Sequence, residues 1–264
     1  MLASTGFAQT QPSGVTTYTG SFADGATYLI EVPSNWNGTL LLYSHGYNVG
    51  PGNPAYDASD PYSEAYLLIG GYALGGSSYA TTGWAIKEAL PDQIAVLDKF
   101  QQLVGSPRTT VAWGTSMGGI ITGGLIQQYP DRFQGALPMC GVMGGDVGFW
   151  NEFLDSAFDF QTLLAPRAGL QLLNITDPTN NLNAADIALN AAQQTAQGRA
   201  RLALVAALAD VPGLVTTGQP PPPPTDYATQ EYNQYGWLIG ADFPFTFYYR
   251  AELEGRAGGN PSFN

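Results

Sequence analysis

The stretch that decides the fold is Thr110-Val111-Ala112-Trp113 followed directly by Gly114-Thr115-Ser116-Met117-Gly118-Gly119. The apolar run predicts a short buried strand, and the apolar residues after the turn recur at helical spacing. Gly114 and Gly118 flank Ser116 where a strained turn and close neighbouring chains leave no room for a Cβ. A Gly-x-Ser-x-Gly motif between a strand and a helix predicts a nucleophilic serine rather than a glycine-rich structural turn. The helix N-terminus would favour an oxyanion there.

Strand-like and helix-like segments alternate on both sides of this motif. The expected strands are residues 27–32, 39–44, 71–75 and 135–141, and the expected helix before the motif is 91–104. Residues 47–63 are rich in Gly, Pro, Asn and Asp and predict a long loop. The alternation predicts an α/β fold with a mostly parallel sheet flanked by helices.

The second half of the chain has a different character. From Phe149 the pattern is mostly helical, with one possible strand at 170–175 and an N-cap at Asp177-Pro178. The run 219–224 contains five prolines and predicts an extended surface connector. We therefore expect three parts: an exposed N-terminal segment (1–14), an α/β core (15–148) and a mainly helical lid or cap (149–264).

Composition excludes several classes of protein. The 264 residues include 9 Lys+Arg and 21 Asp+Glu, so the formal net charge is -12, which argues against nucleic-acid binding. One histidine and one cysteine cannot form a zinc site or an intrachain disulfide, and no cofactor is expected. No apolar run reaches the roughly 18 residues of a membrane span. The scarcity of charge and the small-x-Ala pattern ending at Ala8 favour an exported protein, extracellular or periplasmic.

A second motif lies about 70 residues before the first, as Tyr43-Ser44-His45-Gly46-Tyr47 at the end of an apolar strand. With both motifs, residues 15–145 resemble the α/β-hydrolase superfamily, and specifically its secreted, lid-bearing serine hydrolases. The resemblance implies that Ser116 is the nucleophile. It also implies that the backbone N–H groups of Met117 and Tyr47 form the oxyanion hole. His45 and Gly46 would then support the loop, and His45 would not act as the base.

The same resemblance implies a catalytic histidine that this chain does not contain after Ser116. The superfamily orders its triad as Ser, then Asp or Glu, then His, yet no histidine follows Ser116. An unassisted hydroxyl is a poor nucleophile at neutral pH. We expect the histidine, and with it the acid, to come from a C-terminal part outside this chain. Either the chain is truncated, or a precursor is cut after Asn264 and a companion chain stays associated, which we favour. Asp146 is a candidate acid, although a solvated loop carboxylate is the simpler interpretation.

The expected function is hydrolysis of a small-molecule or polymeric carboxylic ester through an acyl-enzyme on Ser116. Hydrolysis of an amide or peptide by the same residues is the first alternative. A non-catalytic binding protein that has lost its triad is the second. A third is a nucleophile created at the new N-terminus after cleavage beyond Asn264. Cys140 is expected to be a buried small hydrophobic residue.

Overall fold

A six-stranded sheet forms the centre of the first half of the chain in the computed structural model, which describes residues 14–214 and 220–262. The strands are β1 (Val15–Ser21), β2 (Thr27–Pro33), β3 (Thr39–Ser44), β4 (Ala73–Ser77), β5 (Thr109–Thr115) and β6 (Gly135–Met139). Their order across the sheet is β1-β2-β4-β3-β5-β6. β1 and β2 are antiparallel, as are β2 and β4, whereas β4, β3, β5 and β6 are parallel.

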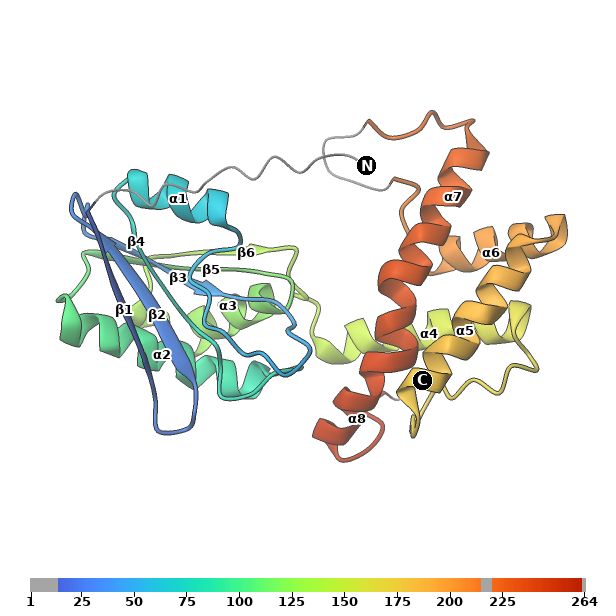
Figure 1. The fold of residues 1–264 in the computed structure, drawn as a ribbon, viewed down its shortest axis with the longest axis horizontal. Helices are drawn as coiled ribbons and strands as arrows, with labels where there is room; N and C mark the ends of the chain where they lie inside the picture. The colour runs from blue at the N-terminus through green and yellow to red at the C-terminus, as the bar shows by residue number, and fades with distance from the viewer. Residues whose placement is uncertain (1–13, 215–219, 263–264) are drawn as a thin grey trace. The chain divides into compact units, whose positions relative to one another are not determined.

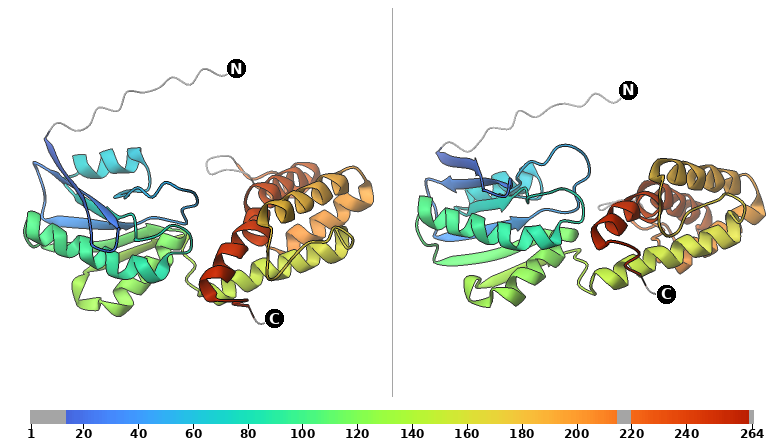
Figure 2. Two further views of the ribbon diagram at one scale, coloured as in Figure 1. Left: turned by 60° about the horizontal axis from the view of Figure 1, so that its bottom comes forward. Right: turned by 90° about the horizontal axis from the view of Figure 1, so that it is seen from below.

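Helices cover both faces of this sheet. α1 (Pro61–Ile69) lies over one face, and α2 (Ile86–Leu103) and α3 (Met117–Gln128) lie over the other (Figures 1 and 2). The short 3-10 helix η1 (Pro130–Arg132) follows α3. The predicted fold class, a mostly parallel sheet flanked by helices, is confirmed. β6 pairs only with β5 among the described residues and is half-exposed, with Leu137 52% exposed.

Apolar residues on the two faces of the sheet explain how the helices pack. On the α1 face, a cluster joins Leu68 of the helix to aromatic and aliphatic residues of the strands, namely Tyr43, Leu74 and Trp113 together with Ala58. On the other face, Val96 of α2 lies over Gly75 of β4, within ordinary van der Waals reach of a Cβ built there. Burial of these side chains holds the parallel strands between two helical layers.

The second compact unit of the chain is helical, and the boundary falls between Met143 and Gly144. Its helices are α4 (Asp146–Leu164), α5 (Pro178–Gln193), α6 (Ala196–Leu208), α7 (Tyr227–Trp237) and α8 (Arg250–Ala257). Asp177 caps α5 as predicted, because its carboxylate accepts a hydrogen bond from the N–H of Asn180. The role of this unit as a lid stays a prediction. Of the proline run, residues 220–224 are described and form neither helix nor strand.

The aromatic segment after α7 packs into the core of the helical unit. Two π-helical segments, η2 (Leu238–Asp242) and η3 (Pro244–Tyr249), join α7 to α8. Pro244 has no N–H to donate, which favours the wider helical turn around it. The rings of Phe160 and Phe243 are 4.5 Å apart, and Phe243 meets Phe247 edge-on at 5.0 Å. Phe243 and Phe247 are therefore core residues, whereas Tyr248 in the same segment is exposed.

Several expectations about secondary structure are wrong. α1 begins inside the predicted loop, where Asp60 caps it by accepting from the N–H groups of Tyr62 and Ser63. The hairpin strand β1 was not expected, and α2 begins at Ile86, so that Pro91 lies within the helix.

The possible strand at 170–175 is absent because side chains hold its amides. The N–H groups of Asn174 and Ile175 donate to the carboxylate of Glu254, each at 3.0 Å. The N–H of Gln171 donates to the side-chain oxygen of Asn181. Pairing with a neighbouring strand would need these same N–H groups.

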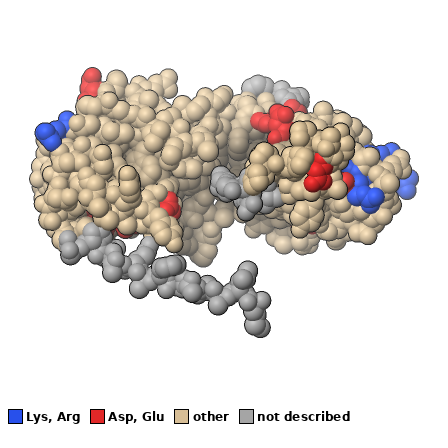
Figure 3. All heavy atoms as spheres, turned by 90° about the horizontal axis from the view of Figure 1, so that it is seen from above, with Lys and Arg blue, Asp and Glu red and all other residues tan. Residues whose placement is uncertain are grey.

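Charged side chains are sparse on the surface. On the face drawn in Figure 3, acidic and basic residues are few and lie scattered among uncharged ones. Among the described residues, no helix combines the length and apolar character required to cross a lipid bilayer.

Candidate functional site

Ser116 lies on a sharp turn between β5 and α3. Its backbone has φ 59° and ψ −123°, a conformation that residues other than glycine rarely adopt. The Ser116 N–H donates to the carbonyl of Met139 at 3.0 Å, and its carbonyl accepts from the N–H of Gly119 at 2.8 Å. These two bonds hold the strained residue, and its side chain is exposed. This is the geometry that the motif predicts for a nucleophile elbow.

Three glycines permit the close approach of chains at this turn. A Cβ on Gly118 would lie 1.9 Å from the carbonyl oxygen of Ser44, and one on Gly114 would lie 2.3 Å from the carbonyl oxygen of Gly118. Gly119 is equally restricted, since its Cβ would lie 2.5 Å from the Cα of Gly141. The turn is thus pressed against the end of β3 and the segment after β6, and no side chain could replace these hydrogens without moving backbone.

The predicted oxyanion donors come from two elements. Met117 is the first residue of α3 and is fully buried, and N–H groups in the first turn of a helix lack intrahelical acceptors. Tyr47 follows β3 by three residues, and its ring packs near that of Trp84 at 5.9 Å. The predicted hole therefore draws on a helix N-terminus and on the loop after β3.

Hydrogen bonds anchor the loop that carries Tyr47. The carbonyl of Asn48 accepts from the N–H of Gly83 at 2.9 Å, and the side-chain amide of Asn53 donates to the carbonyl of Tyr79 at 2.9 Å. Gly46 lies close to the elbow, because a Cβ there would be 3.5 Å from the Cβ of Ser116. The loop is therefore held beside the candidate nucleophile from two sides.

His45 is buried beneath this loop and only 6% exposed. Its Nδ1 lies 2.8 Å from the carbonyl oxygen of Gly46, and its Nε2 lies 3.4 Å from that of Ser78. The imidazole stacks on the ring of Tyr79 at 4.0 Å, and the Tyr79 hydroxyl donates to the His45 carbonyl at 3.1 Å. Burial lowers the pKa of His45. These contacts suit a supporting residue and hold the imidazole away from proton transfer.

The surroundings of the Ser116 hydroxyl bear on the predicted need for an external base. No hydrogen bond from the Ser116 hydroxyl joins it to another described residue, and the sequence holds one histidine, which is committed elsewhere. Asp146, the candidate acid, is the first residue of α4 and belongs to the helical unit. Asn264, the predicted processing site, lies outside the described residues.

Two cavities are relevant to substrate binding. One of about 190 Å³ adjoins the Tyr47 loop, and a larger one of about 460 Å³ lies in the helical unit. The first is lined by Tyr43, His45, Gly46, Tyr47, Asn48, Tyr56, Ala58 and Ser59. The second is lined mainly by polar residues, including the ion pair of Arg199 and Glu231 at 3.8 Å. The first cavity adjoins the predicted oxyanion loop, although Ser116 is not one of its lining residues, and it is the better candidate for the substrate.

The expectation for Cys140 is wrong, because the residue is exposed and not buried. The predicted strand 135–141 ends at Met139, and Cys140 has a positive φ of 47°. The chain turns here so that the Met139 carbonyl can accept from Ser116. Cys140 therefore follows the sheet, directly after the residue that bonds to the elbow.

One group of polar residues was not found from the sequence. Glu31, Asp57 and Glu64 come from β2, the loop before α1, and α1, and their carboxylate oxygens lie within 4.8 Å of one another. The separation of these residues along the chain gives no motif. The one available signal is an acidic residue at a buried position of an otherwise apolar strand, Thr27–Pro33.

Comparisons with known proteins agree with this architecture. Residues 74–160 match the prolyl oligopeptidase family. An o-phthalyl amidase from Xanthobacter agilis is 28% identical over 212 residues, which are 72% of this chain and 45% of that protein. This chain thus spans less than half the length of that relative.

Solved structures similar to the chain include two esterases. One from Aspergillus oryzae has a TM-score of 0.43 at 17% identity, covering 60% of this chain and 33% of its own. Another from Pyrococcus furiosus has a TM-score of 0.42 at 13% identity, covering 56% and 55%. Residues 74–160, which include the elbow, thus resemble that family, and the elbow follows a strand of a mostly parallel sheet flanked by helices.

Proposed function

We propose that this chain belongs to the α/β-hydrolase superfamily and is the nucleophile-bearing part of a serine hydrolase that cleaves carboxylic esters. The observation that carries the proposal is Ser116 itself: exposed, strained at φ 59°, and placed at the N-terminus of α3 directly after a buried strand. Strain of this kind persists only where the surroundings enforce it, and it is concentrated at functional sites.

In the proposed reaction, the Ser116 Oγ attacks the ester carbonyl and its proton passes to a base. The N–H groups of Met117 and Tyr47 stabilise the resulting oxyanion, each contributing about 3–4 kcal/mol in the transition state. The base then protonates the leaving alkoxide, and an acyl group remains on Ser116. Water, deprotonated by the same base, releases the carboxylic acid and restores the serine.

The base is proposed to come from polypeptide outside this chain. His45 is held by Gly46, Ser78 and Tyr79, so it is not available to Ser116. The half-exposed strand β6, with its apolar Leu137 facing outward, offers an edge along which further strands of a C-terminal part could add. Export of the protein is part of the same proposal.

Amide hydrolysis is the second candidate, and one observation favours it. The relative from Xanthobacter agilis is named an o-phthalyl amidase. Serine hydrolases cleave esters and amides with the same residues, and they differ in how well the leaving nitrogen is protonated. Matched p-nitrophenyl ester and p-nitroanilide substrates with one acyl group separate the two candidates by their kcat/KM.

A fluorophosphonate probe tests the nucleophile directly. Mass spectrometry of the labelled protein should place the adduct on Ser116, and Ser116→Ala should abolish labelling. Ser21→Ala is the matched control, because Ser21 is an exposed serine of β1 that lines neither cavity. Labelling that persists in Ser116→Ala would transfer the nucleophile to another residue.

Turnover by the 264-residue chain alone tests the external base. Loss of a triad base lowers the rate by on the order of 10⁶, so the isolated chain should be nearly inactive on p-nitrophenyl esters. Addition of the C-terminal part should restore the rate. A normal enzymatic rate from the isolated chain would show that the base lies within it.

A further inference from the structure

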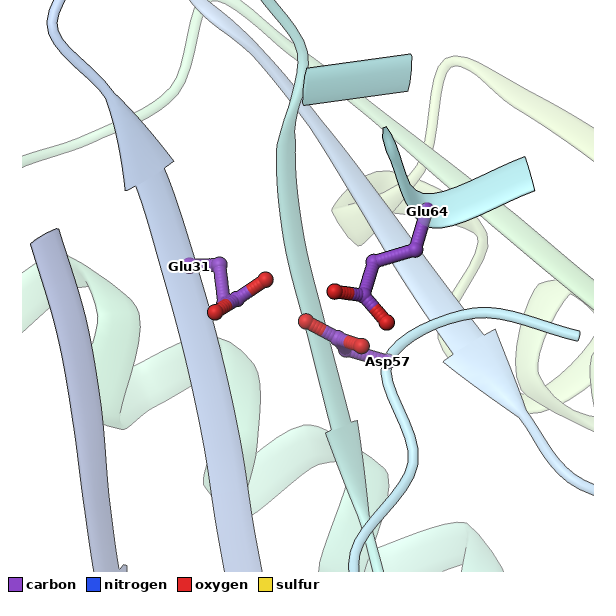
Figure 4. Close-up of side chains that lie close together, drawn as sticks. All are labelled: Glu31, Asp57 and Glu64. Atoms are coloured by element: carbon purple, nitrogen blue, oxygen red, sulfur yellow. The ribbon is translucent and has the colours of Figure 1, made fainter. Parts of the chain in front are cut away.

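Three acidic side chains converge on the face of the sheet that α1 covers. In the sequence, all three lie well before Ser116. Figure 4 shows the carboxylates of Glu31, Asp57 and Glu64 pointing toward one another from β2, the loop before α1, and α1. One oxygen from each lies within 4.8 Å of the others. Glu31 pairs across the sheet with Leu74, a member of the apolar cluster on this face. The carboxylates thus meet beside hydrophobic core and not in open solvent.

Two of these carboxylates are buried with an oxygen that has no partner. Glu31 is 5% exposed and Asp57 is 2% exposed. The Glu31 Oε2 and the Asp57 Oδ2 are inaccessible to solvent and accept no hydrogen bond from any described residue. The Glu31 Oε1 accepts from the Thr17 hydroxyl at 3.0 Å. Buried polar atoms are almost always satisfied, so the two orphaned oxygens call for a ligand.

The cluster also lacks a compensating positive charge. No Lys, Arg or His side chain within the described ranges forms an ion pair with any of the three carboxylates. Uncompensated buried charges of one sign are costly, and proteins satisfy them with protons or with a cation.

We propose that Glu31, Asp57 and Glu64 bind a Ca²⁺ ion. Carboxylate oxygens are hard ligands suited to Ca²⁺, Mg²⁺ and Mn²⁺, and three of them within 4.8 Å of one another can share one ion. Mg²⁺ usually keeps several waters, whereas Ca²⁺ accepts a shell built mainly from protein oxygens. Because Glu31 and Asp57 are buried, the cluster favours Ca²⁺. Bidentate carboxylates and water entering past the half-exposed Glu64 would complete its shell.

An ion here would fix the loop that lines the candidate substrate cavity. Asp57 lies between Tyr56 and Ala58, both of which line the cavity of about 190 Å³. The ring of Tyr56 meets the imidazole of His45 edge-on at 5.5 Å. The Tyr56 carbonyl also presses against β4, since a Cβ on Gly76 would lie 1.9 Å from that oxygen. Ca²⁺ would tie this loop to β2 and α1. The inference does not depend on the reaction proposed for Ser116.

Calorimetry with CaCl₂ tests the site on metal-stripped protein at pH 8. We expect one Ca²⁺ per chain and a Tm raised by about 5–10 °C at 100 times the dissociation constant. Asp57→Asn and Glu31→Gln should abolish both effects. The matched control Asp131→Asn removes one acidic charge from an exposed residue of η1 and should bind as the wild type does.

Folding of the variants is checked in the same experiment. In EDTA, Asp57→Asn should melt at or above the wild-type Tm, because it removes a buried charge, so a lost Ca²⁺ response is not a folding defect. Glu64→Gln, at a half-exposed position, provides an independent variant that should weaken binding at least tenfold.

Three results would overturn the proposal. The first is the absence of binding by wild-type protein at 10 mM Ca²⁺, which would mean that shared protons satisfy the carboxylates. The second is unchanged binding in Asp57→Asn, and the third is stronger binding of Mg²⁺ than of Ca²⁺.

Discussion

Replacement of one Cα hydrogen of Gly118 by a methyl group, as in Gly118→Ala, should disrupt the elbow more than any other small change in α3. In Gly118→Ala, the new Cβ would lie 1.9 Å from the carbonyl oxygen of Ser44, 2.7 Å from its carbonyl carbon and 2.9 Å from the carbonyl oxygen of His45. All three atoms are backbone, so the helix start and the end of β3 must separate by about 1 Å or more. Overpacking of this kind costs about 3 kcal/mol, which corresponds to a Tm lower by about 10 °C.

Gly123→Ala provides the matched control in the same helix. Its Cβ would meet the Cε of Met143 at 2.8 Å, and the end of that flexible side chain can move. Alanine is a better helix former than glycine by up to about 1 kcal/mol, so this variant should be as stable as the wild type or slightly more stable. Both variants contain the same added methyl group and differ only in what it meets.

Thermal unfolding and probe labelling, measured together, check this prediction. Gly118→Ala should lose both stability and fluorophosphonate labelling of Ser116, because the elbow and the Tyr47 loop can no longer approach one another. Gly123→Ala should keep both. If Gly118→Ala melted within about 2 °C of the wild type, the close packing of the elbow against β3 would be refuted.

The remaining predictions concern buried polar groups. Arg250→Met should lower the free energy of unfolding in urea by about 3–5 kcal/mol, because it removes the positive charge that lies 3.4 Å from the buried carboxylate of Glu254. Arg256→Met breaks a more exposed pair with Glu252 and should lower it by under about 1 kcal/mol. In EDTA, the free energy of unfolding should fall as the pH rises from 4 to 8, because burial raises the pKa of Asp57 from 3.8 to about 8 and folding then opposes its ionisation. The difference from Asp57→Asn should reach on the order of 5 kcal/mol, and an identical pH profile for the two proteins would contradict the raised pKa. Tyr79→Phe removes the hydrogen bond at 3.1 Å to the His45 carbonyl and should cost about 1 kcal/mol by denaturant titration, with no change expected in the secondary structure seen by circular dichroism.

The elements that could be predicted from sequence are those whose signals are local. The elbow was predictable because Gly-x-Ser-x-Gly places glycine where a Cβ would clash. The motif also stands between an apolar run typical of a strand and a segment whose apolar residues recur at helical spacing. Asp177-Pro178 was a readable N-cap for the same reason. Asp60-Pro61 has the same signature before α1, yet the surrounding Gly, Pro and Asn favoured a loop. Local composition thus hid a helix whose cap was visible.

The features that could not be predicted depend on partners distant in the chain. The segment 170–175 has the apolar residues of a strand, but Glu254 holds its amides from about 80 residues away. The acidic cluster joins Glu31 to Asp57 and Glu64 only because β2 and α1 meet on one face of the sheet. The supporting role of His45 was expected from the resemblance, but its stacking partner Tyr79 was not, because that residue has no motif of its own.

The outer edge of β6 has a practical consequence for handling the protein. A strand with one unpaired side presents a row of backbone donors and acceptors that another strand can match, and Leu137 adds apolar surface beside it. Concentrated samples of this chain should therefore associate edge to edge into oligomers or aggregates. Lysine at position 137 would oppose such association, since a charge on an edge strand penalises stacking of copies without touching the elbow.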